Sequence, residues 1–110
     1  MAGVIVTYAY KGWLRAVKRE LTQSEGLLNR FTLFDGKRWT ALMAAACRGE
    51  NWEIVKYLLE EGADFKLTDN NGNNALHIAC RYNNSNSKNI RLLSDAMKDT
   101  DSINQKKQRR

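Results

Sequence analysis

The side chains best suited to chemistry are a single histidine and a few aspartates, and they stand apart from one another. His77 is the one histidine among 110 residues. Catalysis by this side chain would need a base partner and a nucleophile nearby, and the sequence places neither there. Asp35, Asp64 and Asp69 occur singly in polar stretches, where aspartate forms turns by local hydrogen bonding rather than paired-carboxylate sites. With no phosphate-cradling glycine loop either, these residues predict a chain that is not an enzyme and needs no cofactor.

The two cysteines point to a reduced core rather than to a metal site. Cys47 and Cys80 have neither the Cys-x-x-Cys spacing nor the Cys/His pattern of zinc proteins. Each lies in an apolar helical run, and free cysteine is often buried. We therefore expect two reduced core thiols, no metal and a reducing compartment.

The composition is that of one small domain with a basic surface. Hydrophobic residues make up 43% of the chain and proline is absent, which favours helices. The formal charge of +6 divides unevenly: five basic and two acidic residues in 1–34, five and six in 35–68, and eight and four in 69–110. Basic ends attract RNA, an acidic protein face or anionic lipid, without choosing among them.

The elements that position these residues repeat along the chain. Residues 35–43 align with residues 69–77 at an offset of 34: an aspartate precedes a polar turn, and Ala-Leu then opens a helix of small residues. A second helix follows in each unit, around residues 54–59 and 90–93, with larger apolar residues on one stripe. Gly62 stands where a left-handed residue would end the second helix. Such a period predicts stacked helix pairs.

These segments resemble the ankyrin repeat family. Residues 39–46, Trp-Thr-Ala-Leu-Met-Ala-Ala-Ala, resemble the family's Thr-Pro-Leu-His-x-Ala-Ala stretch. Residues 53–64 resemble its Ile-Val-x-Leu-Leu-x-x-Gly-Ala-Asp stretch, residues 69–79 open a second such repeat, and residues 8–17 resemble a worn first one. The resemblance implies an all-α fold: a short ankyrin-type helical repeat stack of about three helix pairs, the first and last degenerate.

Several positions depart from the family pattern. Ala41 and Ala75 stand where the family usually has proline, and Arg38 replaces the turn glycine that Gly72 keeps. Residues 83–88 lengthen the turn between the last two helices. The last helix is therefore expected to be the least regular.

We divide the chain accordingly. Residues 1–34 form a degenerate N-terminal repeat, with residues 26–33 as its loop, and residues 35–68 form a full repeat. Residues 69–98 form an irregular C-terminal repeat, and residues 99–110 are a basic polar tail, expected to be disordered or a partly helical extension.

The resemblance also implies roles for single residues. Histidine at the place of His77 ties the turn to the helix by hydrogen bonds. Partners of the family bind to a concave face and loop tips, whose exposed positions here include Gly36 and Cys47. Those that we predict to bind a partner are Lys37, Trp39, Arg48, Thr68, Asn70, Asn71, Asn73, Arg81 and Tyr82.

Each of these residues also has a structural interpretation. Trp39 either packs back on its neighbour or anchors a partner, as interface tryptophans do. Arg48, Arg81 and Tyr82 either form a solvated face or meet an acidic or aromatic partner. The asparagines are also turn formers. Trp13 and Trp52 begin second helices, and each is expected to be a packing residue.

The leading hypothesis is a non-catalytic protein–protein interaction module, an adaptor or a small structural subunit of a larger complex. The alternative is a peripheral ribonucleoprotein subunit that uses its basic termini. The basic tail residues are Lys106, Lys107, Arg109 and Arg110, which could also serve as a nuclear import signal.

The apolar and basic segments of the chain give expectations about its location and assembly. No apolar run reaches the roughly 18 residues of a membrane span, so we expect an intracellular, cytoplasmic protein. The first residues are basic and include no acidic side chain, so the mitochondrion is an alternative location, as is the nucleus. The last apolar stripe lacks a polar cap, so we expect a partner chain, a longer assembly or self-association to cover it.

Overall fold

The computed structural model describes residues 4–83 and 87–108. Helices dominate, and one short hairpin and two 3₁₀ turns join them. The helices are α1 (Val4–Lys11), α2 (Leu14–Gln23), α3 (Ala41–Ala46), α4 (Trp52–Glu60), α5 (Ala75–Tyr82) and α6 (Lys88–Gln108). The hairpin consists of β1 (Thr32–Phe34) and β2 (Lys37–Trp39), and the 3₁₀ turns are Glu25–Leu27 and Gly49–Asn51.

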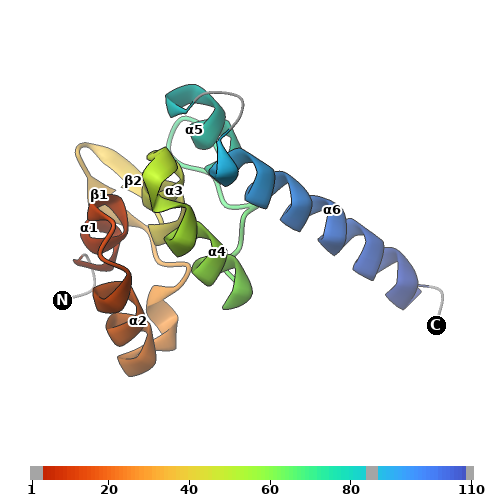
Figure 1. Cartoon of the computed structure of the whole chain (residues 1–110), viewed down its shortest axis with the longest axis horizontal. Coiled ribbons are helices and arrows are strands. Elements are labelled where there is room, and N and C mark those ends of the chain that lie inside the picture. The colour runs from red at the N-terminus through yellow and green to blue at the C-terminus, as the bar shows by residue number, and fades with distance from the viewer. Residues whose placement is uncertain (1–3, 84–86, 109–110) are drawn as a thin grey trace.

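The helices form three antiparallel pairs stacked side by side (Figure 1). The first helices of the pairs form one row, since α3 packs against both α1 and α5. The second helices form another row, in which α4 packs between α2 and α6. The two helices in which the sequence repeats, α3 and α5, are therefore direct neighbours, as the period of 34 residues predicts.

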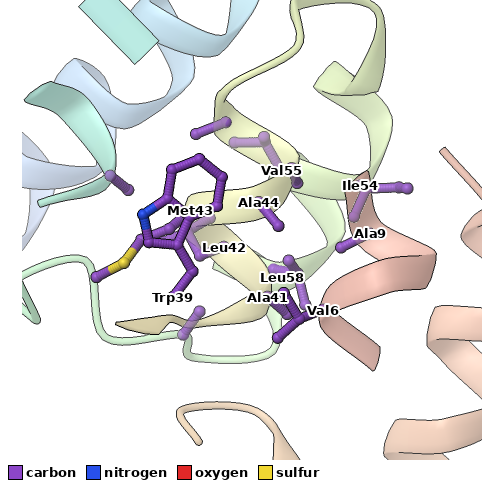
Figure 2. Packing of buried hydrophobic residues seen from close by; sticks show 14 of the residues in the cluster. Val6, Ala9, Trp39, Ala41, Leu42, Met43, Ala44, Ile54, Val55 and Leu58 are labelled. Atoms are coloured by element: carbon purple, nitrogen blue, oxygen red, sulfur yellow. The ribbon is translucent and has the colours of Figure 1, made fainter. Parts of the chain in front are cut away.

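Small side chains in α3 make this close stacking feasible. All six residues of the helix are at most 1% exposed, and four of them are alanines. Alanine has high helix propensity and no bulk, so neighbours can approach α3 on every side. Thr40 begins the helix, because its hydroxyl accepts a hydrogen bond from the Met43 N–H at 3.4 Å. Figure 2 shows side chains of α1, α3 and α4 meeting in this core.

Two glycines end helices as sharp reversals. Gly12 follows α1 with φ +83°, and Gly62 follows α4 with φ +93°. After each glycine the next N–H reaches back to the helix: Trp13 N–H to the Tyr8 carbonyl at 3.0 Å, and Ala63 N–H to the Leu58 carbonyl at 2.9 Å. This six-to-one bond satisfies a carbonyl that the helix end leaves free. The expectation that Gly62 ends its helix in the left-handed region is confirmed.

A hairpin occupies part of the segment that the sequence predicted as loop. β1 pairs antiparallel with β2, so that Phe34 faces Lys37 across a two-residue turn. Asp35 (φ 53°) and Gly36 (φ 78°) both adopt positive φ, which a tight type I′ turn requires and Asp-Gly favours. The prediction of a loop over residues 26–33 is therefore wrong at its end, where two residues belong to β1.

Two buried asparagines cap the ends of the first-row helices from the following unit. Asn51 is 3% exposed, and its Nδ2 donates to the carbonyls of Ala9 (3.0 Å) and Tyr10 (2.9 Å) at the end of α1. Asn89 is fully buried, and its Nδ2 donates to the Arg48 carbonyl at 2.7 Å, just beyond α3. These carbonyls lie at or just beyond helix ends, where the helix supplies fewer donors than in its interior, so each cap joins one repeat to the next.

The asparagine caps are spaced more widely than the helices of the repeat. They lie 38 positions apart, whereas α3 and α5 begin 34 positions apart and α4 and α6 begin 36 positions apart. α5 has eight residues and α3 has six, while five residues separate the helices of the second pair and also those of the third. Of the segment between α5 and α6, residues 84–86 lie outside the described part of the chain.

Expectations about burial are corrected at the two cysteines, whereas the two tryptophans before or at second helices do pack on neighbours. Trp13 is 51% exposed but its ring centroid lies 5.6 Å from that of Tyr8, and Trp52 is half-buried at the start of α4. Cys80 is exposed, because it lies on the side of α5 that no further helix of the described chain covers. Cys47 is buried as predicted for a core thiol, which contradicts its expected place on the exposed face.

The tail continues the last helix. α6 runs without a break through residue 98 to Gln108, so the partly helical alternative holds for this stretch. Arg109 and Arg110, and the side chains of Lys106 and Lys107, lie outside the described part of the chain.

No helix within the described residues combines the length and the apolar character that crossing a bilayer requires.

The caps can be tested with Asn51→Asp, which keeps the size of the side chain but turns the donor toward Ala9 and Tyr10 into an acceptor. We expect the free energy of unfolding in urea to fall by about 2–4 kcal/mol, because both bonds donated by Asn51 would be lost and a buried carboxylate would face two carbonyl oxygens. The exposed Asn70 provides the matched control, and Asn70→Asp should change stability by less than about 0.5 kcal/mol. Equal stability of the two variants would contradict the role of the cap.

Candidate functional site

Four aromatic side chains form a continuous row across all three helix pairs. Tyr10 ends α1, Phe34 and Trp39 come from the hairpin, and Tyr82 ends α5. The ring centroids of Tyr10 and Phe34 are 5.0 Å apart, those of Phe34 and Trp39 are 5.9 Å apart and stacked, and those of Trp39 and Tyr82 are 6.4 Å apart edge to face. We call these four residues the aromatic row. Such pairs add about 0.5–1.5 kcal/mol each beyond burial, so the row fixes the hairpin against the helix ends.

Trp39 is the buried centre of the row. It is only 4% exposed, so its predicted place among the exposed residues is wrong. The side chain packs back on its neighbours, which agrees with the structural interpretation of this residue. The indole lies in the hydrophobic core (Figure 2), and its Nε1 donates to Asp69 Oδ2 at 3.3 Å. Trp39 therefore acts on the exposed surface indirectly, through the neighbouring residues that it holds in place.

Asp69 organises the loop that follows the first full repeat. Its Oδ1 accepts hydrogen bonds from the backbone N–H groups of Asn71 and Asn73, both at 2.9 Å, while Oδ2 accepts from Trp39. Burial by itself would raise the pKa of this carboxyl, but the three donors together hold its pKa below the ordinary value. The carboxylate thus ties the loop to the hairpin of the preceding repeat.

Two cations lie against the row. The Arg48 guanidinium is 5.2 Å from the Tyr10 ring centroid and donates to the Tyr10 carbonyl at 3.2 Å. Lys37 Nζ is 5.6 Å from the Trp39 ring centroid. Each cation also has a carboxylate near it: Glu50 at 3.1 Å from Arg48, and Asp35 at 3.8 Å from Lys37. Ion pairs of this kind at the surface contribute about 1 kcal/mol or less, so neither pair holds its cation strongly.

Two adjoining hollows open along the row and share Lys37, Trp39 and Tyr82. The larger, of about 160 Å³, is lined by Tyr10, Phe34, Asp35, Lys37, Trp39, Cys47, Arg48 and Tyr82. The smaller, of about 110 Å³, is lined by Lys37, Trp39, Asp69, Asn71, Asn73, Ile78, Arg81 and Tyr82. Each has about the volume of one amino-acid side chain, below the roughly 300 Å³ at which ordinary small-molecule sites begin.

Most of the residues predicted to bind a partner meet at these hollows. Tyr82 is 52% exposed between them, and Arg81 is exposed at the rim of the smaller one. Asn71 and Asn73 line the smaller hollow while their N–H groups hold the turn, which supports their second interpretation as turn formers. Thr68 and Asn70 are exposed on the same loop but line neither hollow.

His77 is part of a helix cap. Its Nδ1 accepts a hydrogen bond from the Asn74 N–H at 3.2 Å, and the Asn74 Oδ1 accepts from the His77 N–H at 2.9 Å. This reciprocal capping box satisfies two backbone donors at the start of α5. The expectation that His77 ties the turn to the helix is confirmed.

The sequence analysis missed Tyr10 and Phe34 as site residues. Phe34 could have been found from the Asp-Gly pair at 35–36, which predicts a hairpin and places Phe34 opposite Lys37. Tyr10 lies in the last turn of α1 and carries no comparable signal, because its spacing of 38 to Arg48 differs from the repeat period of 34. Asn51 and Asn89 carry no signal in a single sequence, because an asparagine beside a helix start is usually a cap of that helix.

The link between Asp69 and Trp39 gives a pH-dependent prediction. The charged Asp69 accepts bonds only in the folded chain, so its stabilisation is present above the ordinary pKa and is lost as pH falls through the lower folded pKa. Asp69→Asn should lower the free energy of unfolding by about 1.5–3 kcal/mol at neutral pH. The difference from the wild type should shrink below about pH 4, as urea unfolding across a pH series can show. The exposed Asp35 serves as control, because Asp35→Asn should leave the curve unchanged.

The two thiols should differ sharply in reactivity. Burial raises the pKa of Cys47 to about 11, although nearby Arg48 and Lys37 act in the opposite direction. Its Sγ also donates to the Ala44 carbonyl at 3.2 Å. We expect iodoacetamide at slightly alkaline pH to label the exposed Cys80 in the folded chain, and Cys47 only after unfolding, because thiolates and not thiols react. Peptide mass spectrometry measures both sites, and equal labelling under native conditions would contradict the burial of Cys47.

Comparison with known proteins agrees with the stacked helix pairs. The family of ankyrin repeats matches residues 7–106 in three copies. Ankyrin repeat and SAM domain-containing protein 6 of mouse, and likewise of rat, is 46% identical over 56 residues, which are 51% of this chain and 6% of that protein. An ankyrin repeat protein of Acanthamoeba polyphaga mimivirus is 39% identical over 62 residues, which are 56% of this chain and 8% of that protein. No solved structure matches the chain at a significant level.

The chain thus spans less than a tenth of the length of these relatives. The family match covers nearly the whole chain, and the family's three copies equal in number the three helix pairs of the described residues. Ankyrin repeats are generally protein-binding modules and are typically non-catalytic. On this evidence the chain belongs to the ankyrin repeat family.

Proposed function

We propose that this chain binds an acidic segment of a partner protein along the aromatic row, and acts as an adaptor or as a small structural subunit of a larger complex. One observation carries the proposal. Two hollows meet at the exposed ring of Tyr82, and three cations, Lys37, Arg48 and Arg81, line them.

Shape and chemistry both favour a protein segment. Hot spots at protein interfaces are enriched in tyrosine, tryptophan and arginine that sit in small, well-packed hollows. Tyr82 offers an aromatic surface, and Arg81 offers a planar set of donors for carboxylates. The buried Trp39, itself bonded to Asp69, packs against the Tyr82 ring. A rigid surface of this kind loses little entropy on binding.

The geometry gives less support to RNA as the partner at this face. Single-stranded RNA binds to proteins by stacking successive bases on exposed rings. Tyr82 is exposed, but Tyr10 and Phe34 are only half-exposed and Trp39 is buried between its neighbours. The row therefore offers one free ring rather than a platform.

The proposal is tested by capture of partners from a native extract with the tagged chain. Tyr82→Ala and Arg81→Glu should each reduce recovery of a stoichiometric partner at least about tenfold, because truncation of a hot-spot residue costs 2 kcal/mol or more. The control is Lys66→Glu, which changes an exposed cation that lines neither hollow. Calorimetry with the purified partner should then give the same order of affinities.

Two outcomes would contradict the proposal. Undiminished recovery by both variants, with the helical circular dichroism of the wild type, would show that the partner binds elsewhere. Loss of the partner on ribonuclease treatment, together with a steep fall of affinity with salt, would favour the ribonucleoprotein alternative.

A further inference from the structure

A second concave feature lies away from the aromatic row, between the second-row helices α4 and α6. It is a groove of about 280 Å³. Its lining residues are Trp52, Lys56, Lys88, Arg91, Leu92 and Asp95. None of these residues lines the hollows along the aromatic row. Figure 1 shows α6 leaving the stack beside α4, so that its later turns project beyond the other helices.

The apolar part of the groove is built from Trp52 and Leu92, both half-buried. Lys88 Nζ lies 4.1 Å from the Trp52 ring centroid, the shortest of the cation–ring distances within the described part of the chain. The ammonium is thereby held at the groove, since cation–π attraction reaches about 6 Å. The volume is below the 300–1,000 Å³ of ordinary small-molecule sites, and suits one or two partner side chains.

The charged part of the groove is unbalanced. Lys56, Lys88 and Arg91 provide three positive charges, and Asp95 provides one negative charge. Among the described residues, ion pairs within 4.0 Å join Lys37 to Asp35 and Arg48 to Glu50, and none involves these three cations. Three cations close together repel one another, and a partner that brings carboxylates relieves that repulsion.

We propose that this groove is a second protein-docking site, which binds an acidic peptide segment with one apolar side chain between its carboxylates. The apolar side chain packs on Trp52 and Leu92. The flanking carboxylates pair with Lys56 on one wall and Arg91 on the other. The charge of the groove selects the acidic segment, and the small apolar floor selects the single large side chain within it.

An extended polyanion such as RNA fits the groove less well. Phosphate chains bind along continuous basic surfaces with several exposed rings. Here the carboxylate of Asp95 lies in the wall and repels phosphate, and Trp52 is the one ring of the lining. A peptide whose carboxylates flank one apolar residue fits these groups better, because its carboxylates pair with the cations and its apolar side chain packs on the Trp52 ring.

The test uses the full chain and fluorescein-labelled peptides, with fluorescence anisotropy for affinity and NMR amide shifts for location. The probe is a peptide of glutamates around one leucine, and its partner peptide has serine in place of the leucine. We expect shifts at Lys56, Arg91 and Leu92, and a dissociation constant at least about fivefold weaker for the serine peptide, about 1 kcal/mol. Arg91→Glu should weaken binding of the leucine peptide about tenfold or more.

Lys98→Glu is the matched control, because Lys98 is an exposed cation of α6 that does not line the groove. It should change the affinity less than about twofold. Arg81→Glu, at the aromatic row, should leave the amide shifts at Lys56, Arg91 and Leu92 unchanged, so this result is independent of the first proposed site. Equal weakening by Arg91→Glu and Lys98→Glu, shifts confined to the aromatic row, or tighter binding of a labelled oligouridine than of the peptide would each overturn the proposal.

Discussion

The structure depends on satisfying the carbonyl groups at the ends of buried first-row helices. Packing α3 between α1 and α5 leaves those ends without water, and an unpaired buried carbonyl costs as much as a lost hydrogen bond. Asn51 and Asn89 supply the donors from the next unit. Stacking and capping are therefore one requirement: a repeat is complete only when the repeat after it is in place.

The same requirement sets the geometry of the candidate site. The carbonyls that the asparagines hold include those of Tyr10 and Arg48, two residues that line the larger hollow. The hairpin is held separately, by the bond of Trp39 to Asp69 and by ring contacts on both sides of the indole. Residues from three repeats thus form one rigid surface, although no single repeat contains it.

The two proposed binding surfaces differ in origin. The aromatic row follows from features that repeat, namely helix ends and the turn before each first helix. The groove at Trp52 lies between two second-row helices, α4 and α6, and shares no lining residue with the row.

The sequence by itself determined the family, the helix pairs, the left-handed end at Gly62 and the cap at His77, because these depend on residues close together in the chain. It also identified Arg48, Arg81 and Tyr82, which the structure brings to one pair of hollows. Only the tertiary structure decided that Trp39 is buried, that Cys80 is exposed, and that Asn51 and Asn89 reach across to preceding helices. Burial and long-range bonds depend on which neighbour covers a residue, and the distance along the chain to that neighbour, 30 residues for Trp39 and about 40 for the asparagines, is beyond any local pattern.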